Sequence, residues 1–199
     1  MICCYCDISK KNICVGKIEN TYFYNRTNEY TLPDDKCRTY VSYLLLKQMV
    51  AKIYNLNLDK IDVVRDKNNK PQIKDNGFCF NISHSKNIVA VVVDDNPVGI
   101  DVEQLRKTDL RVVSKYFDTM SPQIQNSIYP DEEYTKQWTI YESQLKLFGS
   151  QQLLMQNKTK VFTHSFTLSD SIDTKYHLSV SSSNPFDNIE IVQINNPKI

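Results

Sequence analysis

The chain has 199 residues, 24 of them basic and 23 acidic, so its formal net charge at pH 7 is +1. With 41% hydrophobic residues, it can bury a core as one large domain or two small ones. A charge this close to zero disfavours a general nucleic-acid binder but allows a local basic pocket. The longest fully apolar run, residues 88–93, is too short to span a membrane, and the first residues lack a secretory pattern. We therefore expect a cytoplasmic protein without a membrane or nucleic-acid partner.

Six cysteines are present, and Cys3 and Cys6 form a C-x-x-C pair. Without a second pair at suitable spacing, zinc or redox chemistry is less well supported than a strand of small apolar side chains. The cysteines are thus expected to be free thiols.

One helix dominates the expected first half of the chain. An apolar stripe beginning at Tyr43 predicts it over residues 34–54, with Asp34 or Asp35 as its cap. Residues 88–93 are apolar throughout, which is typical of a strand buried on both faces. Strands are expected at residues 1–8, 20–24, 78–83, 88–93 and 98–103, with a loop or short hairpin at 63–76.

The second half is expected to begin with broken helix over residues 104–133, interrupted at Pro122 and Pro130. A stronger helix follows and ends at Gly149. Its apolar stripe, taken as its buried face, is Tyr134, Trp138, Tyr141, Leu145 and Phe148. Three strands are expected at residues 160–168, 176–181 and 189–194.

Helix and strands alternate in both halves of the sequence. This predicts an α+β or α/β chain with two similar lobes, residues 1–97 and 98–199.

Two carboxylates lie two residues apart on the strand expected at 98–103. Asp101 and Glu103 therefore project from one face, and burying them together is costly unless a cation lies between them. The alternative is a solvent-exposed strand end.

A second charged pair, Glu142 and Lys146, lies four residues apart on one face of the later helix. Such a pair is commonly a surface ion pair. It could also add a third metal carboxylate and a cation for a phosphate, as a magnesium site requires.

His84 lies where a strand meets a turn, where a lone histidine usually makes a structural hydrogen bond. The four scattered glycines exclude a P-loop and a dinucleotide fingerprint. No G-x-S-x-G nucleophile turn is present either.

Three segments in order resemble the 4′-phosphopantetheinyl transferases of the larger, surfactin-synthetase-activating (Sfp) type. They are NISHS at 81–85, VGIDVE at 98–103 and WTIYESQLK at 138–146. Shorter likenesses are NKP at 69–71 and CRT at 37–39, so the resemblance covers about residues 35 to 149.

The resemblance implies two lobes related by a pseudo-two-fold axis, with coenzyme A in the cleft between them. It implies a monomer that transfers phosphopantetheine to a serine of an apo acyl or peptidyl carrier protein, releasing 3′,5′-ADP. Metal ligands would be Asp101, Glu103 and Glu142 for Mg²⁺, with Glu142 and Lys146 catalytic. Coenzyme A would contact Arg38, Lys70, Pro71, Ser83 and His84. Of these, Arg38, Lys70 and His84 would bind its 3′-phosphoadenosine end.

Two departures from the family pattern concern charge and backbone. Tyr141 replaces the lysine that usually precedes the helix glutamate, and Asn69 replaces a glycine. Two rival hypotheses therefore stay open: a degenerate relative that binds coenzyme A or a carrier without transfer, and a different metal-dependent phosphotransferase or hydrolase.

Overall fold

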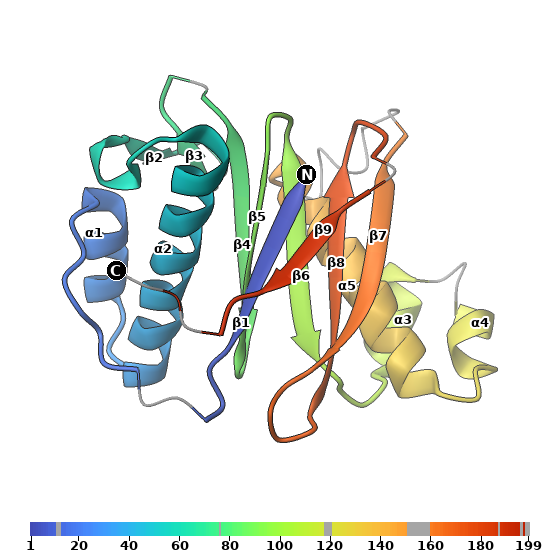
Figure 1. Ribbon diagram of the computed structural model, residues 1–199. Helices are drawn as coiled ribbons and strands as arrows, with labels where there is room; N and C mark the ends of the chain where they lie inside the picture. The colour runs from blue at the N-terminus through green and yellow to red at the C-terminus, as the bar shows by residue number, and fades with distance from the viewer. Residues whose placement is uncertain are drawn as a thin grey trace.

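The computed structural model describes residues 1–10, 13–75, 77–117, 121–150, 160–186, 188–195 and 197. Helices and strands are mixed along the chain, as predicted (Figure 1). In order, the elements are β1 (Ile2–Asp7), α1 (Thr21–Glu29), α2 (Pro33–Tyr54), the 3-10 turn η1 (Leu58–Lys60), β2 (Val63–Arg65), β3 (Pro71–Ile73), β4 (Cys79–Ser85), β5 (Ile88–Asp94), β6 (Val98–Gln104), α3 (Leu110–Tyr116), α4 (Ser121–Gln125), α5 (Pro130–Phe148), β7 (Phe162–Ser169), β8 (Lys175–Ser182) and β9 (Glu190–Gln193).

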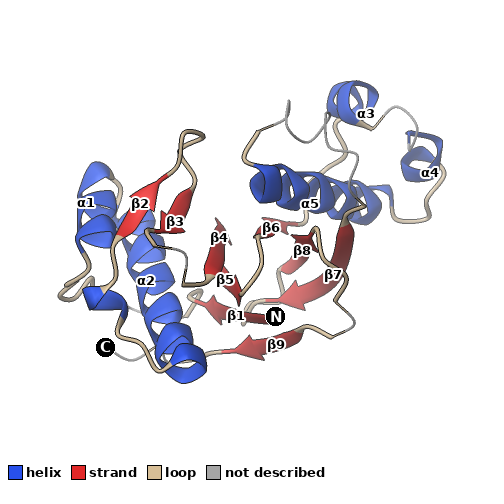
Figure 2. Ribbon diagram, turned by 90° about the horizontal axis from the view of Figure 1, so that it is seen from above, coloured by secondary structure: helices blue, strands red, loops and turns tan. Residues whose placement is uncertain are grey.

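Two sheets form the centre of the molecule. One has the strand order β4-β5-β1-β9 and the other β6-β8-β7, while β2 and β3 form a separate hairpin. Helix α2 packs against the first sheet and α5 against the second, so that the layers run helix, sheet, sheet, helix (Figures 1 and 2). β9 pairs in parallel with β1, and a segment late in the sequence thereby completes the first sheet.

Strand β5 shows why the two sheets pack together. Val89, Val91 and Val93 join the core beneath α2, whereas alternate residues such as Ile88 and Val92 join the core between the sheets. The expectation of a strand buried on both faces is therefore confirmed.

Strands β6 and β8 alternate in the same way but carry a polar second face. Val98, Ile100 and Val102 enter the core between the sheets, with Tyr176, Leu178 and Val180 of β8. The intervening residues of both strands consequently face α5, because successive strand side chains point to opposite sides.

The predicted buried face of α5 is wrong. Of the expected apolar stripe only Tyr134 is buried, and it packs with α3 and α4. The helix instead buries a face of small polar side chains, represented by Thr135, Thr139 and Ser143. Hydropathy could not indicate this face, because its hydroxyl groups become buried by bonding to carbonyl oxygens of the helix and, for Thr139 and Ser143, to serines of the second sheet.

Three local expectations are also corrected. Residues 20–24 begin helix α1 rather than a strand, because Asn20 caps it by accepting hydrogen bonds from Tyr22 N at 3.1 Å and Phe23 N at 3.4 Å. Neither predicted aspartate caps α2, which begins at Pro33. Pro122 and Pro130 lie at the starts of α4 and α5 instead of interrupting a helix.

The other expected elements are confirmed, including the hairpin within residues 63–76, the strand around Cys3 and Cys6, and the three late strands. None of the six cysteines, all of which the structure describes, forms a disulfide bond. Among the described residues, no helix is both long and apolar enough to cross a membrane.

Candidate active site

A cleft of about 700 Å³ opens between the two halves of the fold. One wall comes from α1, α2, the β2–β3 hairpin and β4, and the other from β6 and α5 (Figure 2). The first wall contributes only basic charged groups, whereas every lining carboxylate lies on the second. The charged lining residues are Arg26, Arg65, Asp101, Glu103, Arg106, Glu142 and Lys146, and the first wall also carries the imidazole of His84.

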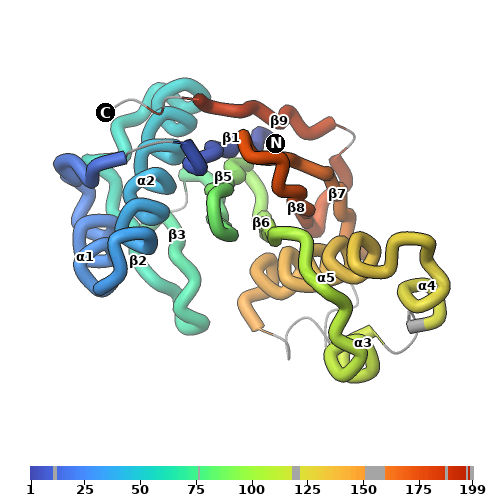
Figure 3. Tube along the Cα trace, turned by 90° about the horizontal axis from the view of Figure 1, so that it is seen from below, coloured from blue at the N-terminus to red at the C-terminus, as the bar shows by residue number. Residues whose placement is uncertain are grey.

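Close packing of α5 on β6 assembles the second wall (Figure 3). Gly99 makes this approach possible, because a Cβ atom there would lie 2.0 Å from the carbonyl oxygen of Ser143 and 2.6 Å from Leu147 N. Asp101 and Glu103 follow on the same face of β6, and Glu142 and Lys146 lie on α5. The structure thus brings all four predicted residues to one cleft.

Asp101 is the most enclosed of the three carboxylates. Its Oδ1 lies 2.7 Å from Lys146 Nζ and accepts a hydrogen bond from Ser83 Oγ at 2.9 Å. Lys146 Nζ also donates to Ser83 Oγ at 2.9 Å. Asp101 Oδ2 is buried and has no hydrogen-bond partner in the described part of the chain, so one oxygen of this carboxylate remains unused.

The two glutamates are unfavourable places for negative charge. Burial raises the pKa of Glu103, and the nearby Asp101 carboxylate raises it further. The pKa of Glu142 is raised by the same two causes in the same order, against a smaller lowering by Lys146. A cation in this part of the cleft would relieve the crowding.

The donor set suits a hard divalent cation, since it offers carboxylate oxygens and the unused Oδ2 of Asp101. The side chains do not converge as a ready metal centre: the described residues contain no group of three His, Cys, Asp or Glu side chains placed to hold an ion. Lys146 neutralises Asp101 instead. The residue types therefore fit magnesium, while their present arrangement is that of an ion pair.

Of the residues expected at coenzyme A, Pro71, Ser83 and His84 line the cleft. His84 is exposed at its surface. The pKa of its imidazole is lowered, first because protein groups displace water around the ring and second because Arg38 and Lys146 are nearby. Its exposure limits this effect, and the imidazole is neutral at pH 7.

Arg38 and Lys70 are not among the residues that line the cleft. Arg38 pairs with Asp35 at 2.8 Å and donates to the carbonyl oxygen of Lys86. Lys70 Nζ donates to the carbonyl oxygens of Val98 at 3.1 Å and Leu147 at 3.4 Å, linking the hairpin to β6 and the end of α5. Burial lowers the pKa of Lys70.

Three cleft arginines were not singled out from the sequence. Arg26 lies on α1, which was expected to be a strand; Arg65 ends β2; Arg106 follows β6. The guanidinium of Arg106 lies 4.6 Å from the ring centroid of Trp138. Its Nε and Nη2 are buried without a hydrogen-bond partner among the described residues. A search for basic residues within three positions of VGIDVE would have found only Arg106.

Comparison with known proteins gives an independent result. A family model described as 4′-phosphopantetheinyl transferase, N-terminal, matches residues 13–96. The 4′-phosphopantetheinyl transferase psf-1 of Bacillus pumilus is 31% identical over 119 residues, 58% of this chain and 51% of the relative. The transferase gsp of Aneurinibacillus migulanus is 28% identical over 125 residues, 60% and 52% of the two chains. Sfp of Bacillus subtilis (strain 168) is 26% identical over 171 residues, 76% of each chain.

The chain is related to the Sfp-type 4′-phosphopantetheinyl transferases. The resemblance seen in its three motifs is thereby confirmed. Its matched part spans about half the length of the first two relatives, 51% and 52%.

The main departure from the Sfp-type pattern has a structural explanation. Tyr141 packs on the aromatic rings of Tyr116, Phe117 and Trp138, at centroid distances of 5.4, 5.8 and 6.1 Å. It is not among the residues that line the cleft. Tyr141 is therefore a packing residue, as expected from its place on the apolar stripe.

Proposed function

We propose that this protein transfers the 4′-phosphopantetheine group of coenzyme A to a serine of an apo acyl or peptidyl carrier protein. The observation that carries the proposal is the single cleft in which Asp101, Glu103, Glu142 and Lys146 meet, opposite a wall whose charged residues are all basic. Phosphoryl transfer depends mainly on positioning and charge neutralisation, which such a cleft supplies. The relatives named as 4′-phosphopantetheinyl transferases support the same activity.

In the proposed reaction, the carrier serine oxygen forms a bond to the β-phosphorus of coenzyme A. The bond from that phosphorus to the bridging oxygen breaks, and 3′,5′-ADP leaves with the bond's electron pair. Glu142 has a raised pKa, which suits it to accept the serine proton. Lys146 lies beside Asp101 and would donate to phosphate oxygens, either on the transferred group or on the leaving group.

Asp101, Glu103 and Glu142 would hold magnesium, which would neutralise the pyrophosphate when bound. The unused Oδ2 of Asp101 supports this part of the proposal. Binding would require the glutamates to turn toward Asp101, because no ready metal group exists among the described residues.

The adenosine end of coenzyme A would lie on the basic wall. His84 and Pro71 are in place there, and Arg26 and Arg65 add two cations. Arg38 and Lys70 remain predicted contacts, although their present bonds would have to break. Replacing each of the four cations by a neutral residue and comparing coenzyme A with dephospho-coenzyme A identifies those that bind the 3′-phosphate, since only they lose affinity for coenzyme A selectively.

The same proposal includes two lobes, residues 1–97 and 98–199, related by a pseudo-two-fold axis, in a cytoplasmic monomer. The packing of one long helix on one sheet in each half supports the repeat. Strand β9 belongs to the second lobe by sequence and to the first by pairing.

The deciding experiment incubates the protein with coenzyme A, magnesium and an apo carrier protein, and measures the carrier's mass. Conversion to the holo mass is expected, and Asp101→Ala should abolish it while the protein stays folded. Coenzyme A binding without conversion would instead identify a degenerate binder. Near-normal turnover by the variant in magnesium would contradict the metal assignment.

A further inference from the structure

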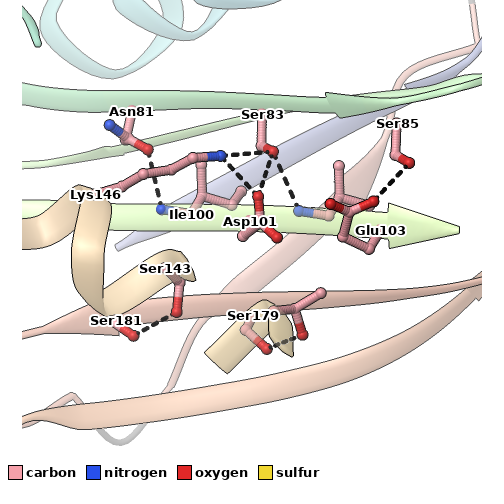
Figure 4. Close-up of polar contacts among 12 residues, drawn as sticks. Asn81, Ser83, Ser85, Ile100, Asp101, Glu103, Ser143, Lys146, Ser179 and Ser181 are labelled. Atoms are coloured by element: carbon pink, nitrogen blue, oxygen red, sulfur yellow. Dashed lines mark hydrogen bonds and ion pairs between the residues drawn. The ribbon is translucent and has the colours of Figure 1, made fainter. Parts of the chain in front are cut away.

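The edge strands of the two sheets are joined by side chains rather than by a backbone ladder. Asn81, Ser83 and Ser85 alternate along β4 and share the face toward β6 (Figure 4). Asn81 Oδ1 accepts from Ile100 N at 3.1 Å, Ser83 Oγ from Val102 N at 3.2 Å, and Ser85 Oγ from Gln104 N at 3.1 Å. The backbone N–H groups of three alternate residues of β6 thus donate hydrogen bonds to side chains of β4.

The two serines make a second bond that Asn81 does not make. Ser83 Oγ donates to Asp101 Oδ1 at 2.9 Å, and Ser85 Oγ donates to Glu103 Oε2 at 3.1 Å (Figure 4). The same pattern therefore occurs twice, two residues apart on each strand. Each hydroxyl holds the β6 backbone and the carboxylate beside it at once.

The bonding capacity of Ser83 is fully used. A hydroxyl has one donor and two acceptor positions. Ser83 donates to Asp101 and accepts from Val102 N and from Lys146 Nζ. Contact with coenzyme A would require it to release one of these partners, whereas its present bonds all fix groups of the second wall.

We propose that Ser83 and Ser85 are positioning residues, which orient the carboxylates of Asp101 and Glu103 through the same hydroxyl groups that join the two sheets. This inference rests on the proposed function for its catalytic consequence, but the orientation itself does not. A glutamate on a strand has several side-chain rotamers, and a hydrogen bond from a fixed donor selects one of them. The serine hydroxyl groups that align the two halves therefore also align the carboxylates.

Ser85 offers the cleaner test, because it makes fewer bonds than Ser83. Ser85→Ala and Asn81→Ala each remove one acceptor for a β6 N–H group, but only Ser85→Ala removes a bond to a carboxylate. Both should lower the unfolding midpoint by similar amounts. Ser85→Ala should also lower kcat about tenfold or more without weakening coenzyme A binding measured in the absence of metal. Ser85→Thr, which keeps the hydroxyl, should restore the rate.

Crystal structures of the wild type and Ser85→Ala test the orientation without any assay. The Glu103 carboxylate should lie against residue 85 in the wild type and be displaced or split in the variant. If Ser85→Ala does not fold, Ser85→Cys keeps the shape, weakens the donor, and should show the same changes to a smaller extent.

An unchanged Glu103 carboxylate in the folded variant would overturn the inference, as would an equal loss of kcat in Asn81→Ala. A displaced carboxylate in a protein that transfers nothing to any carrier would support the positioning role and contradict the proposed function instead.

Discussion

The two long helices cover their sheets by different physical means. Helix α2 buries large apolar side chains such as Leu45, Leu46 and Val50 against the first sheet. Helix α5 buries Thr139 and Ser143, which bond to the hydroxyl groups of β8.

The hydroxyl groups between α5 and the second sheet form two short chains, and Figure 4 shows one contact of each. Thr139 Oγ1 lies 2.8 Å from Ser179 Oγ, and Ser143 Oγ lies 2.7 Å from Ser181 Oγ. Thr163 Oγ1 lies 2.8 Å from the same Ser181 Oγ. Small side chains and a glycine let the helix approach closely, and their hydroxyl groups bond to one another in the buried contact.

This difference explains where the functional groups lie. A helix held by directional bonds at short range has a fixed rotation about its axis, whereas an apolar face tolerates some adjustment. Fixed rotation keeps Glu142 and Lys146 aimed at the carboxylates of β6. Three residues of the apolar stripe of α5, Tyr134, Trp138 and Tyr141, instead pack against α3 and α4.

The largest effect is expected from a side chain placed where α5 lies closest to β6. Gly99→Ala places a methyl group within 2.0 Å of a backbone oxygen that cannot move aside. We expect a loss of more than about 4 kcal/mol in the free energy of unfolding, measured by urea denaturation. Gly77→Ala is the control, because nothing lies within 4 Å of its Cβ position. Equal stability of the two variants would contradict the close approach.

The next effect compares the two helices directly. Leu45→Ala in α2 should cost about 3 kcal/mol through lost burial and a cavity. Ser143→Ala in α5 should cost about 1 kcal/mol, because the hydroxyl's bonds to Ile140 O and Ser181 are lost while Ser181 keeps Thr163. If Ser143→Ala costs as much as Leu45→Ala, apolar burial is not what distinguishes the two contacts.

A smaller effect tests the polar contact of β1 with the turn between β7 and β8. Burial raises the pKa of Asp7, but hydrogen bonds from Ser171 and Ser9 outweigh it and hold the pKa below its ordinary value. The stabilisation is therefore complete above about pH 4 and is lost as the pH falls through the lowered pKa. Asp7→Asn should cost about 1 kcal/mol at pH 7. That difference from the wild type should shrink at pH 3, whereas a pH-independent difference would refute the assignment.

The smallest effect concerns the departure from the family pattern. Tyr141→Lys should lower stability modestly, because an aromatic contact is lost and the longer side chain can extend its ammonium to water. Transfer should change less than it does on loss of any cleft carboxylate. A wild type without detectable transfer, made strongly active by the lysine, would refute our interpretation of Tyr141.

Much of the fold could be predicted because its signals are local. The run at residues 88–93, the stripe from Tyr43 and the stop at Gly149 each report burial or backbone geometry within one element. The strand predicted at 20–24 was wrong because a single cap, Asn20, decides for a helix there.

The residues of the candidate site likewise divide into those that local patterns predicted and those that they did not. The sequence predicted the three carboxylates and Lys146 as site residues, because the strand period places one pair on a face of β6 and the helix period places the other on a face of α5. Arg26 was missed with its helix, and Arg65 had no pattern to mark it. Lys70 matched a family motif, but its ammonium is drawn to two backbone carbonyl oxygens that belong to other elements.

By itself, the sequence determined the identity and local spacing of the reactive groups, because a period of two or of 3.6 residues is a property of one element. Only the tertiary structure decided which face α5 buries, which hydroxyl groups orient Asp101 and Glu103, and which cations line the opposite wall. These outcomes depend on partners far apart in the chain, such as Ser83 with Asp101 and Thr139 with Ser179. The hydropathy of a serine or threonine does not indicate whether its hydroxyl group faces water or is buried with a hydrogen-bond partner. No pattern along the chain could therefore have revealed these contacts.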